Sequence, residues 1–294
     1  MKAIEVGDLE VWPVSDGGFR LDGGAMFGVV PKVLWERVKP ADDKNRIQMA
    51  TNCLLIRRGE RLLLIDTGIG DKNDEIFRDR FGMEAGARRL PEDMERQGFA
   101  LADVTDVLLT HLHFDHCGWN TRLDESGRLV PTFENARYWI ERGEVEHARQ
   151  PSERDRASYD GRNWEPLFEA GVVRLFDGEA TPIPGVKALK APGHNADMCI
   201  VLLDGGGKGR DAIFFADLVP TTAHLPGPWI MGYDLYPLET LANKKHWLRE
   251  AAVGQWLAFF EHEDQTPLAR VVEEKPGRFR AEPASEIAPL AVHQ

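Results

Sequence analysis

The sequence predicts an α/β fold, an α+β arrangement in four layers, in which two mixed β-sheets are flanked by helices. Short apolar runs of strand length recur along the chain, hairpin signals occur in each half, and helical stretches separate the groups of strands. This order of strands, helix, strands and helix implies two sheets with helices outside them. The 294 residues exceed the usual domain size, but large mixed domains reach this length, so we expect one domain over residues 1–294.

Local signals predict the elements of the first half. An alternating stretch opens the chain, a proline starts a short helix, and Arg57-Arg58-Gly59-Glu60 joins two apolar runs as a hairpin. The expected strands cover residues 3–14, 51–56, 62–65, 104–109 and 136–140. The expected helices cover residues 31–38 and 91–97.

Glycines between residues 15 and 28 predict an irregular loop in the N-terminal part. Its apolar Phe19, Met26 and Phe27 either fold back on the core or line a pocket. We expect residues 15–40, together with residues 218–238 near the other end, to be pocket-lining embellishments of the domain.

The second half begins with a charged helical region over residues 141–170, broken by Pro151 and by the loop around Asp160-Gly161. The strongest helical periodicity spans residues 238–260. A glycine-rich hairpin is expected over residues 204–210. The tail up to residue 294 gives no clear signal after its first strand. The expected strands cover residues 172–176, 186–189, 198–203, 212–216 and 269–272.

Charge and cysteine content narrow the class of function. The 36 basic and 48 acidic residues give a net charge of −12, which argues against nucleic acid and anionic membranes and favours a small-molecule substrate. Cys53, Cys117 and Cys199 cannot form a fully paired disulfide framework. With acidic residues near the N-terminus and no apolar run of membrane length, we expect a cytoplasmic protein. Its oligomeric state is open, and a homodimer is one option.

The most informative stretch is Thr110-His111-Leu112-His113-Phe114-Asp115-His116-Cys117-Gly118. On an extended segment His111 and His113 point the same way, and Asp115 and His116 lie past the following bend. Imidazole and carboxylate together suit zinc, iron, manganese or cobalt. The alternative is a set of solvated loop histidines. We expect Cys117 to be a small buried residue rather than a ligand.

Further polar residues stand where predicted elements end. His194 follows a strand in a Pro-Gly turn, Asp217 ends an apolar strand, and His262 comes after the last long helical region. Asp66, at the mouth of a strand, either supports a site from behind or caps a turn. His147 lies among charged residues and is expected to be a solvated helix residue.

Taken together, His111-x-His113-x-Asp115-His116, Gly193-His194, Asp217 and His262, with Asp66-Thr67-Gly68, resemble the metallo-β-lactamase superfamily. The resemblance covers roughly residues 50–265 and implies an αβ/βα sandwich with a metal centre between its sheets. It implies that one ion is held by His111, His113 and His194. The second would be held by Asp115, His116 and His262, and Asp217 would bridge both.

A bridging acid sets the chain apart from true β-lactamases. Two stretches look most like the quorum-quenching lactonase and methyl-parathion-hydrolase branch. They are the N-terminal loop of residues 15–28, with its glycines and phenylalanines, and the sequence Phe259-Phe260-Glu261-His262. One departure is Pro220, where lactonases of this type often have a tyrosine. The resemblance therefore implies a hydrolase with two divalent ions, zinc first and iron, manganese or cobalt as alternatives.

Two such ions acidify a shared water, so a hydroxide bridging them would attack a lactone or related ester. Asp115 and Asp217 are the expected catalytic acids, and Asp115 would orient the nucleophile or protonate the leaving group. A thioesterase or phosphoesterase on the same centre, and a non-hydrolytic oxidoreductase or ligand sensor, are the alternatives. The candidate substrate pocket, which could equally be core, consists of Phe19, Phe27, His224, Trp229, Met231 and Tyr233.

Overall fold

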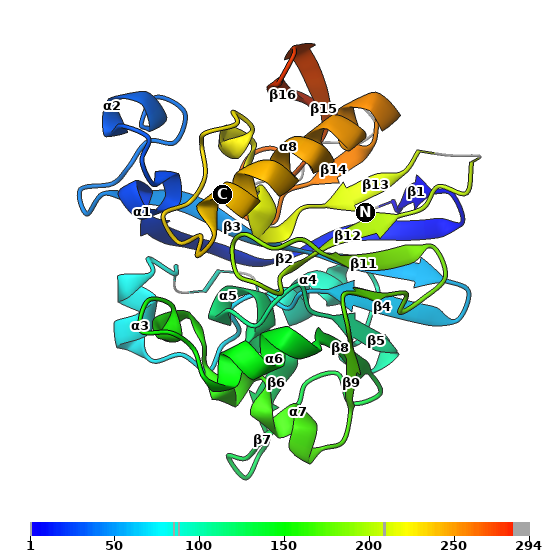
Figure 1. Ribbon diagram of the computed structural model, residues 1–294. Helices are drawn as coiled ribbons and strands as arrows, with labels where there is room; N and C mark the ends of the chain where they lie inside the picture. The colour runs from blue at the N-terminus through cyan, green and yellow to red at the C-terminus, as the bar shows by residue number, and fades with distance from the viewer. Residues whose placement is uncertain (1, 85, 88, 208–209, 285–294) are drawn as a thin grey trace.

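The computed structural model describes residues 2–84, 86–87, 89–207 and 210–284. Within them two seven-stranded sheets lie against each other, as predicted (Figure 1). The first sheet has the order β1 (Ile4–Val6), β2 (Leu9–Asp22), β3 (Arg46–Arg58), β4 (Arg61–Ile65), β5 (Asp106–Leu108), β8 (Arg137–Glu141) and β9 (Val173–Phe176). The second has the order β10 (Glu179–Ala180), β11 (Val186–Lys190), β12 (Cys199–Leu203), β13 (Ala212–Phe214), β14 (Leu257–Phe259), β15 (Leu268–Lys275) and β16 (Arg278–Pro283). A two-stranded sheet pairs β6 (Thr121–Leu123) with β7 (Leu129–Pro131).

Alternation along the strands explains why the first sheet is covered on both faces. In β4, Leu63 and Ile65 belong to the apolar cluster shared with the second sheet, whereas Leu62 and Leu64 belong to the cluster on the other face. Because successive side chains of a strand point to opposite faces, one apolar run serves two cores.

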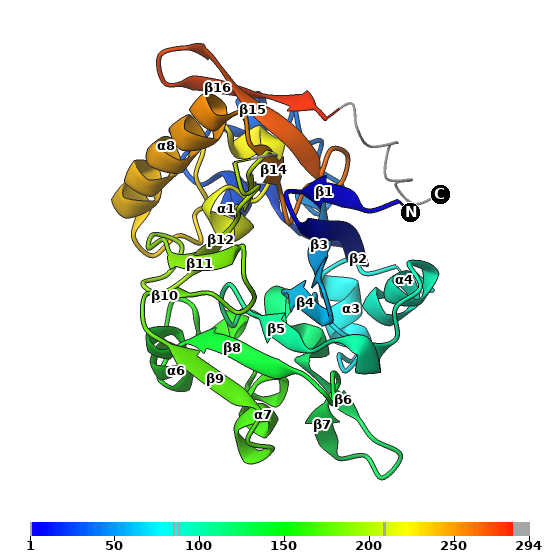
Figure 2. The same cartoon turned by 90° about the vertical axis from the view of Figure 1, so that its right-hand side faces the viewer.

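Helices cover the outer faces of the two sheets, which makes the predicted sandwich (Figures 1 and 2). The long α8 packs against β15 of the second sheet, α4 contacts β2 of the first sheet, and α6 contacts β8. The helices are α1 (Gly23–Phe27), α2 (Lys32–Trp35), α3 (Glu75–Arg80), α4 (Leu90–Arg96), α5 (Phe114–Cys117), α6 (Arg142–Arg149), α7 (Glu165–Glu169) and α8 (Pro237–Gly254).

The topology brings several strand ends to one edge of the sandwich. Strands β4 and β5 are parallel neighbours in the first sheet, and β13 and β14 are parallel neighbours in the second. Because the carboxyl ends of parallel strands meet at the same edge, the polar residues that follow these strands are brought together in pairs. These residues are Asp66 after β4, the His111–His116 stretch after β5, Asp217 after β13 and His262 after β14.

The predicted loop over residues 15–28 is wrong. Strand β2 continues to Asp22, and α1 follows directly. The long β3 supplies pairing partners along this stretch, and a register shift between Ser15 and Gly18 accommodates one extra residue as a bulge. Gly17 lies within this bulge and has a φ of 92°, a backbone conformation that glycine adopts readily.

The predicted helix over residues 238–260 is too long. Helix α8 ends at Gly254, and Gln255 adopts a left-handed conformation with φ of 52°. The apolar residues that follow form strand β14, because they pair in parallel with β13 of the second sheet. The charged region 141–170 holds two short helices, α6 and α7, and the expected breaks at Pro151 and at Asp160-Gly161 lie between them.

The C-terminal part contains more strand than the sequence predicts. Strand β15 is longer than the expected 269–272, and β16 pairs with it as a hairpin. Residues 285–294 of the tail, and residues 208 and 209 of the expected 204–210 hairpin, lie outside the described residues.

The sequence analysis found no apolar run of membrane length and no set of cysteines that could pair fully. In the part of the chain that the structure describes, none of the helices combines the length and apolarity needed to cross a bilayer. Cys53, Cys117 and Cys199 are free thiols, all buried. The Cys117 Sγ atom lies 3.1 Å from the carbonyl oxygen of His113 and 3.4 Å from that of Leu112, so the thiol packs behind the motif.

Candidate metal centre

The structure gathers the seven predicted ligands into two neighbouring groups. One group consists of His111, His113, His194 and Asp217, and the other of Asp115, His116 and His262. Within each group the nitrogen and oxygen atoms suited to bind a metal lie within 4.8 Å of one another, and all seven residues are buried.

Asp217 lies between the two groups. Its Oδ2 atom is 3.2 Å from His194 Nε2 and 3.9 Å from His111 Nε2, both of the first group. Its Oδ1 atom is 3.0 Å from His262 Nε2 of the second group. One carboxylate therefore faces both sets of imidazoles.

The histidines are held from behind through their Nδ1 atoms, which turns Nε2 towards Asp217. Such partners fix the ring orientation of metal-binding histidines. The contacts are His111 to Thr110 Oγ1 at 3.1 Å, His116 to Asp66 Oδ2 at 3.1 Å, His194 to Asp234 Oδ1 at 3.1 Å, and His262 to the Ala50 carbonyl oxygen at 2.9 Å. His113 is the exception, because its Nδ1 faces His194 Nε2 at 3.0 Å.

Two buried atoms of the first group have no hydrogen-bond partner in the protein. These are Nε2 of His111 and Nε2 of His113. Buried polar atoms are rarely left unpaired, so such atoms indicate an ion or other group that binds them. Imidazole and carboxylate donors are those that zinc and related divalent ions prefer, and the two groups therefore fit a dinuclear metal site.

Three of the candidate ligands, His111, His113 and Asp217, are held in the forms that bind cations. The pKa values of His116 and His194 are instead raised by the carboxylates beside these rings, against the effect of burial. Burial, reinforced by neighbouring histidines, holds the pKa of His111 and of His113 well below the usual value, which leaves their lone pairs free. Burial by itself would raise the pKa of Asp217. The surrounding His262, His194 and His116 outweigh this and hold that pKa well below its usual range.

A third polar group lies behind His116. Asp66 accepts hydrogen bonds from the backbone and hydroxyl of Thr110, at 2.8 and 2.6 Å, as well as facing His116. Glu261 Oε2 also lies 3.0 Å from His116 Nδ1, and Glu261 is completely buried. Of the two roles open to Asp66 from sequence, its contacts are those of a residue that supports the site from behind.

Close backbone packing fixes the segment that carries Asp115 and His116 of the second group. The amide of Gly118 donates to the Gly68 carbonyl at 2.6 Å, and the amide of Thr67 donates to the His116 carbonyl at 2.7 Å. A Cβ atom on Gly118 would lie 1.9 Å from the carbonyl carbon of Ile69. Only glycine fits here, which explains the Gly118 that ends the motif.

Most of the candidate pocket residues are interior. Phe19 and Phe27 are fully buried and Met231 nearly so, within one apolar cluster that Trp229 borders. The Phe19 ring contacts the His262 ring edge to face at 5.5 Å. Tyr233 is 37% exposed, and burial of its phenol raises its pKa to about 12. A substrate role for these residues stays a prediction.

The imidazole of His224 is used inside the protein. It is 1% exposed, its Nε2 lies 2.9 Å from the Met26 carbonyl oxygen, and its ring stacks on Phe27 at 4.7 Å. Burial lowers the pKa of His224 to about 3, so the ring is neutral at physiological pH. These contacts connect the segment after Asp217 to α1.

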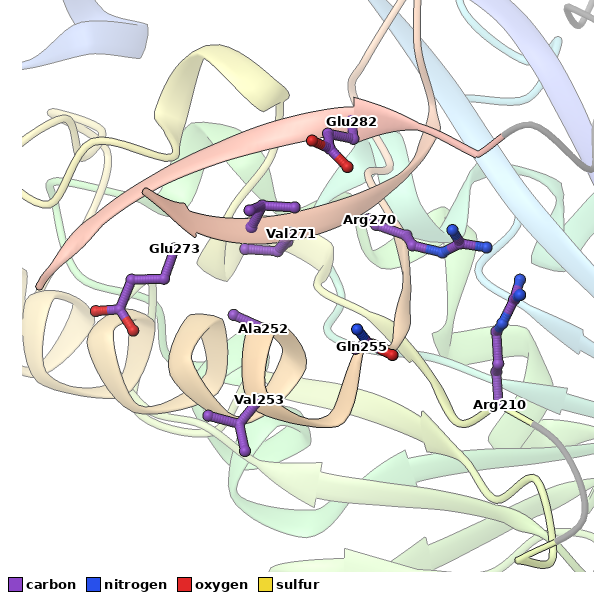
Figure 3. A pocket seen from close by; sticks show the side chains of 9 residues that line it. Arg210, Ala252, Val253, Gln255, Arg270, Val271, Glu273 and Glu282 are labelled. Carbon is purple, nitrogen blue, oxygen red and sulfur yellow. The ribbon is translucent and has the colours of Figure 1, made fainter. Parts of the chain in front are cut away.

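Two other features lie apart from the seven candidate ligands. His147 on α6 is half-buried and pairs with Asp155 through Nε2 at 2.5 Å, so it is less solvated than predicted. A hollow of about 340 Å³ lies between the end of α8 and strands β15 and β16 (Figure 3). Its lining, which includes Arg210, Arg270 and Glu282, contains none of the seven.

The sequence did not indicate three of the acids that support the centre. Glu261 precedes a predicted ligand, which is its only signal. Asp234 lies in a loop and Glu144 in a charged helix, where acidic residues are common. Their contacts with His194 and with the loops of the first group depend on tertiary structure alone.

Comparisons with known proteins agree with this geometry. A model of the metallo-beta-lactamase superfamily matches residues 46–262, the stretch that contains all seven candidate ligands. An N-acyl homoserine lactonase of Bacillus cereus is 25% identical over 174 residues, which make up 56% of this chain and 62% of that enzyme. The match thus spans about three fifths of that relative.

Two solved structures share the whole architecture. A "probable metal-dependent hydrolase" from Staphylococcus aureus is 28% identical, with a TM-score of 0.85 and coverage of 96% of this chain and 99% of that one. A dizinc quorum-quenching lactonase, solved in complex with a product, has a TM-score of 0.78 at 24% identity and covers 98% of both chains. The likeness to the dizinc lactonase shows that the two chains share a fold.

Proposed function

Because this chain belongs to the metallo-β-lactamase superfamily, we propose that it is a dinuclear metal-dependent hydrolase that acts on a lactone or a related ester. The observation that carries the proposal is the position of Asp217 between two groups of buried ligand-type side chains. A small molecule is the proposed substrate, in keeping with the net charge of −12.

The proposal assigns each group to one ion. His111, His113 and His194 would hold the first, Asp115, His116 and His262 would hold the second, and Asp217 would contact both. Zinc suits these donors best, and iron, manganese or cobalt would also fit. When bound, two such ions acidify a water molecule and polarise the oxygen of the scissile bond.

The protein's own contribution is to place the reacting groups. Asp115 retains 10% exposure of its side chain, more than the 7% of Asp217, and lies 3.9 Å from His116 Nε2. A carboxylate beside the centre can orient a water molecule and pass a proton to a leaving alcohol.

One comparison favours a lactone or ester over other substrates, and a second agrees with it in fold alone. The Bacillus cereus relative is a lactonase, although the match covers only 62% of it. The dizinc lactonase shares the fold over 98% of both chains. The same kind of centre also suits the hydrolysis of thioesters or phosphoesters, and the binding of a ligand without hydrolysis. The test below distinguishes these alternatives.

The test is a hydrolysis panel with the zinc-loaded protein. Lactones, aryl esters, thioesters and phosphotriesters would be compared at equal concentration, with Asp217→Asn as the matched inactive control. We expect turnover of lactones or esters that the control lacks. Preference for thioesters or phosphotriesters would overturn the substrate class, and absence of all turnover from a two-zinc protein would overturn the proposed hydrolase.

A further inference from the structure

The three histidines of the first group come from loops of different sheets. His111 and His113 follow β5 of the first sheet, whereas His194 follows β11 of the second. Zinc sites require ligand positions accurate to a few tenths of an ångström. The two loops must therefore be held at a fixed separation.

One buried carboxylate contacts both loops. Glu144 lies in the first turn of α6 and is 1% exposed. Its Oε1 atom accepts a hydrogen bond from the amide of Leu112, the residue between His111 and His113, at 2.8 Å. Its Oε2 atom accepts from Nδ2 of Asn195, the residue after His194, also at 2.8 Å.

The neighbours of Glu144 strengthen this connection. The Asn195 side chain uses its Oδ1 atom to accept from the amides of Asp197 and Met198, at 2.9 and 2.6 Å, so its amide group cannot turn over without losing both bonds. The Tyr159 hydroxyl donates to Glu144 Oε1 at 3.2 Å. The Tyr159 ring lies edge to face against His113, with centroids 4.7 Å apart.

The position of Glu144 is itself determined by its helix. The carboxylate of Glu141, the residue that caps α6, accepts from the amide of Glu144 at 3.1 Å. Helix α6 packs against β8 of the first sheet, so the carboxylate projects from a supported element rather than from a loop.

We propose that Glu144 is a positioning residue for the first metal ion, which sets the separation of the His111–His113 loop and the His194 loop by accepting from Leu112 and Asn195 at once. The inference rests on the proposed dinuclear centre. Glu144 itself touches neither metal nor substrate, and acts through the loops that carry the ligands.

A swap of donor and acceptor tests this geometry. In Glu144→Gln the side chain has one acceptor and one donor, so it cannot accept from both Leu112 and Asn195. In Asn195→Asp two carboxylates face each other. In the double variant, the new glutamine side chain keeps an acceptor for Leu112 and donates to the new aspartate, which still accepts from the amides of residues 197 and 198.

The readout is the release of zinc from the loaded protein to a competing chelator. Each single variant should release one of its zinc ions at a chelator concentration about 10- to 100-fold lower than the wild type needs, as is typical when a partner behind a ligand is lost. The double variant should return towards the wild-type value. Glu146→Gln, an exposed position on the same helix, controls for loss of one negative charge.

The outcomes separate the two proposals. A wild-type protein that holds only one zinc ion contradicts the dinuclear centre, but Glu144→Gln must still loosen that ion if Glu144 positions the first group. Single variants that retain both ions as firmly as the wild type overturn the role of Glu144. Where a single variant does not fold, the double variant decides: wild-type retention supports the inference, and easy loss of one ion refutes it.

Discussion

Asp217 places its Oδ1 atom 3.0 Å from Nε2 of His262, so a carboxylate that follows β13 meets a histidine that follows the parallel neighbour β14. Neither residue is near the other in sequence. The contact arises because both strands end at the same edge of the second sheet, where the stretch that carries His111 to His116 arrives from the first sheet. The candidate metal centre thus lies where the two sheets meet.

Replacing Asp234 by asparagine should weaken the hold on the first metal ion. Asp234 Oδ1 faces His194 Nδ1 at 3.1 Å, and the neutral amide loses the charge-assisted bond that orients the ring. We expect zinc affinity or turnover to fall about 10- to 100-fold. Chelator competition and steady-state kinetics measure this, with the exposed Glu153→Gln as control. Unchanged zinc affinity would show that Asp234 does not orient His194.

Introducing a methyl group at Gly118 should destabilise the fold. The new Cβ would lie 1.9 Å from the Ile69 carbonyl carbon, which is backbone and cannot turn away. We expect the free energy of unfolding to fall by about 3 kcal/mol, the upper part of the range for overpacking. Urea unfolding measures it. In Gly227→Ala the nearest atoms are 3.9 Å away, so that control should change by less than about 0.5 kcal/mol.

Stability should depend on pH through Glu144. Burial raises the pKa of Glu144 to about 7, above its ordinary 4.5, so the folded protein binds this proton more tightly than the unfolded chain. The resulting stabilisation is complete below pH 4.5 and is lost as pH rises to 7. Relative to Glu144→Gln, we expect the metal-free wild type to lose about 3 kcal/mol across this window. A difference that stays constant with pH would contradict the raised pKa.

Replacing Lys39 by methionine should destabilise the connection between α2 and the segment after His262. Lys39 is nearly buried, and its ammonium pairs with Glu263 at 3.1 Å and with Asp264. Methionine leaves the Glu263 carboxylate buried and short of a partner, at a cost of about 3 kcal/mol. Urea unfolding measures the loss, with the exposed Lys245→Met as reference. Equal stability of the two variants would show that the buried pair contributes nothing.

Local patterns predict much of the fold. The run Leu62 to Ile65 shows the strand, and its alternation accounts for apolar clusters on both faces of the first sheet. The same reasoning fails where pairing overrides composition. Glycines near residue 17 indicate a loop, yet β3 holds this stretch as a bulged strand. The residues after Gly254 look helical, yet the position beside β13 makes them β14.

Some residues of the candidate site could be predicted from the sequence, and others could not. Histidines two apart, an acid and a further histidine within six residues make the ligand stretch visible in the sequence. Glu144, Asp234 and Glu261 carry no such pattern, because one acid at a helix start or in a loop has many ordinary roles. Only their burial and their contacts behind the ligand loops distinguish them.

The most direct test of the central claim is the metal content of the purified, zinc-loaded protein and of Asp217→Ala, measured by elemental analysis per folded chain. Two ions per chain in the wild type, and loss of at least one in the variant, are the predicted result, because Asp217 faces both ligand groups. One ion or none in the wild type, or two ions retained by the variant, would contradict a dinuclear centre bridged by Asp217.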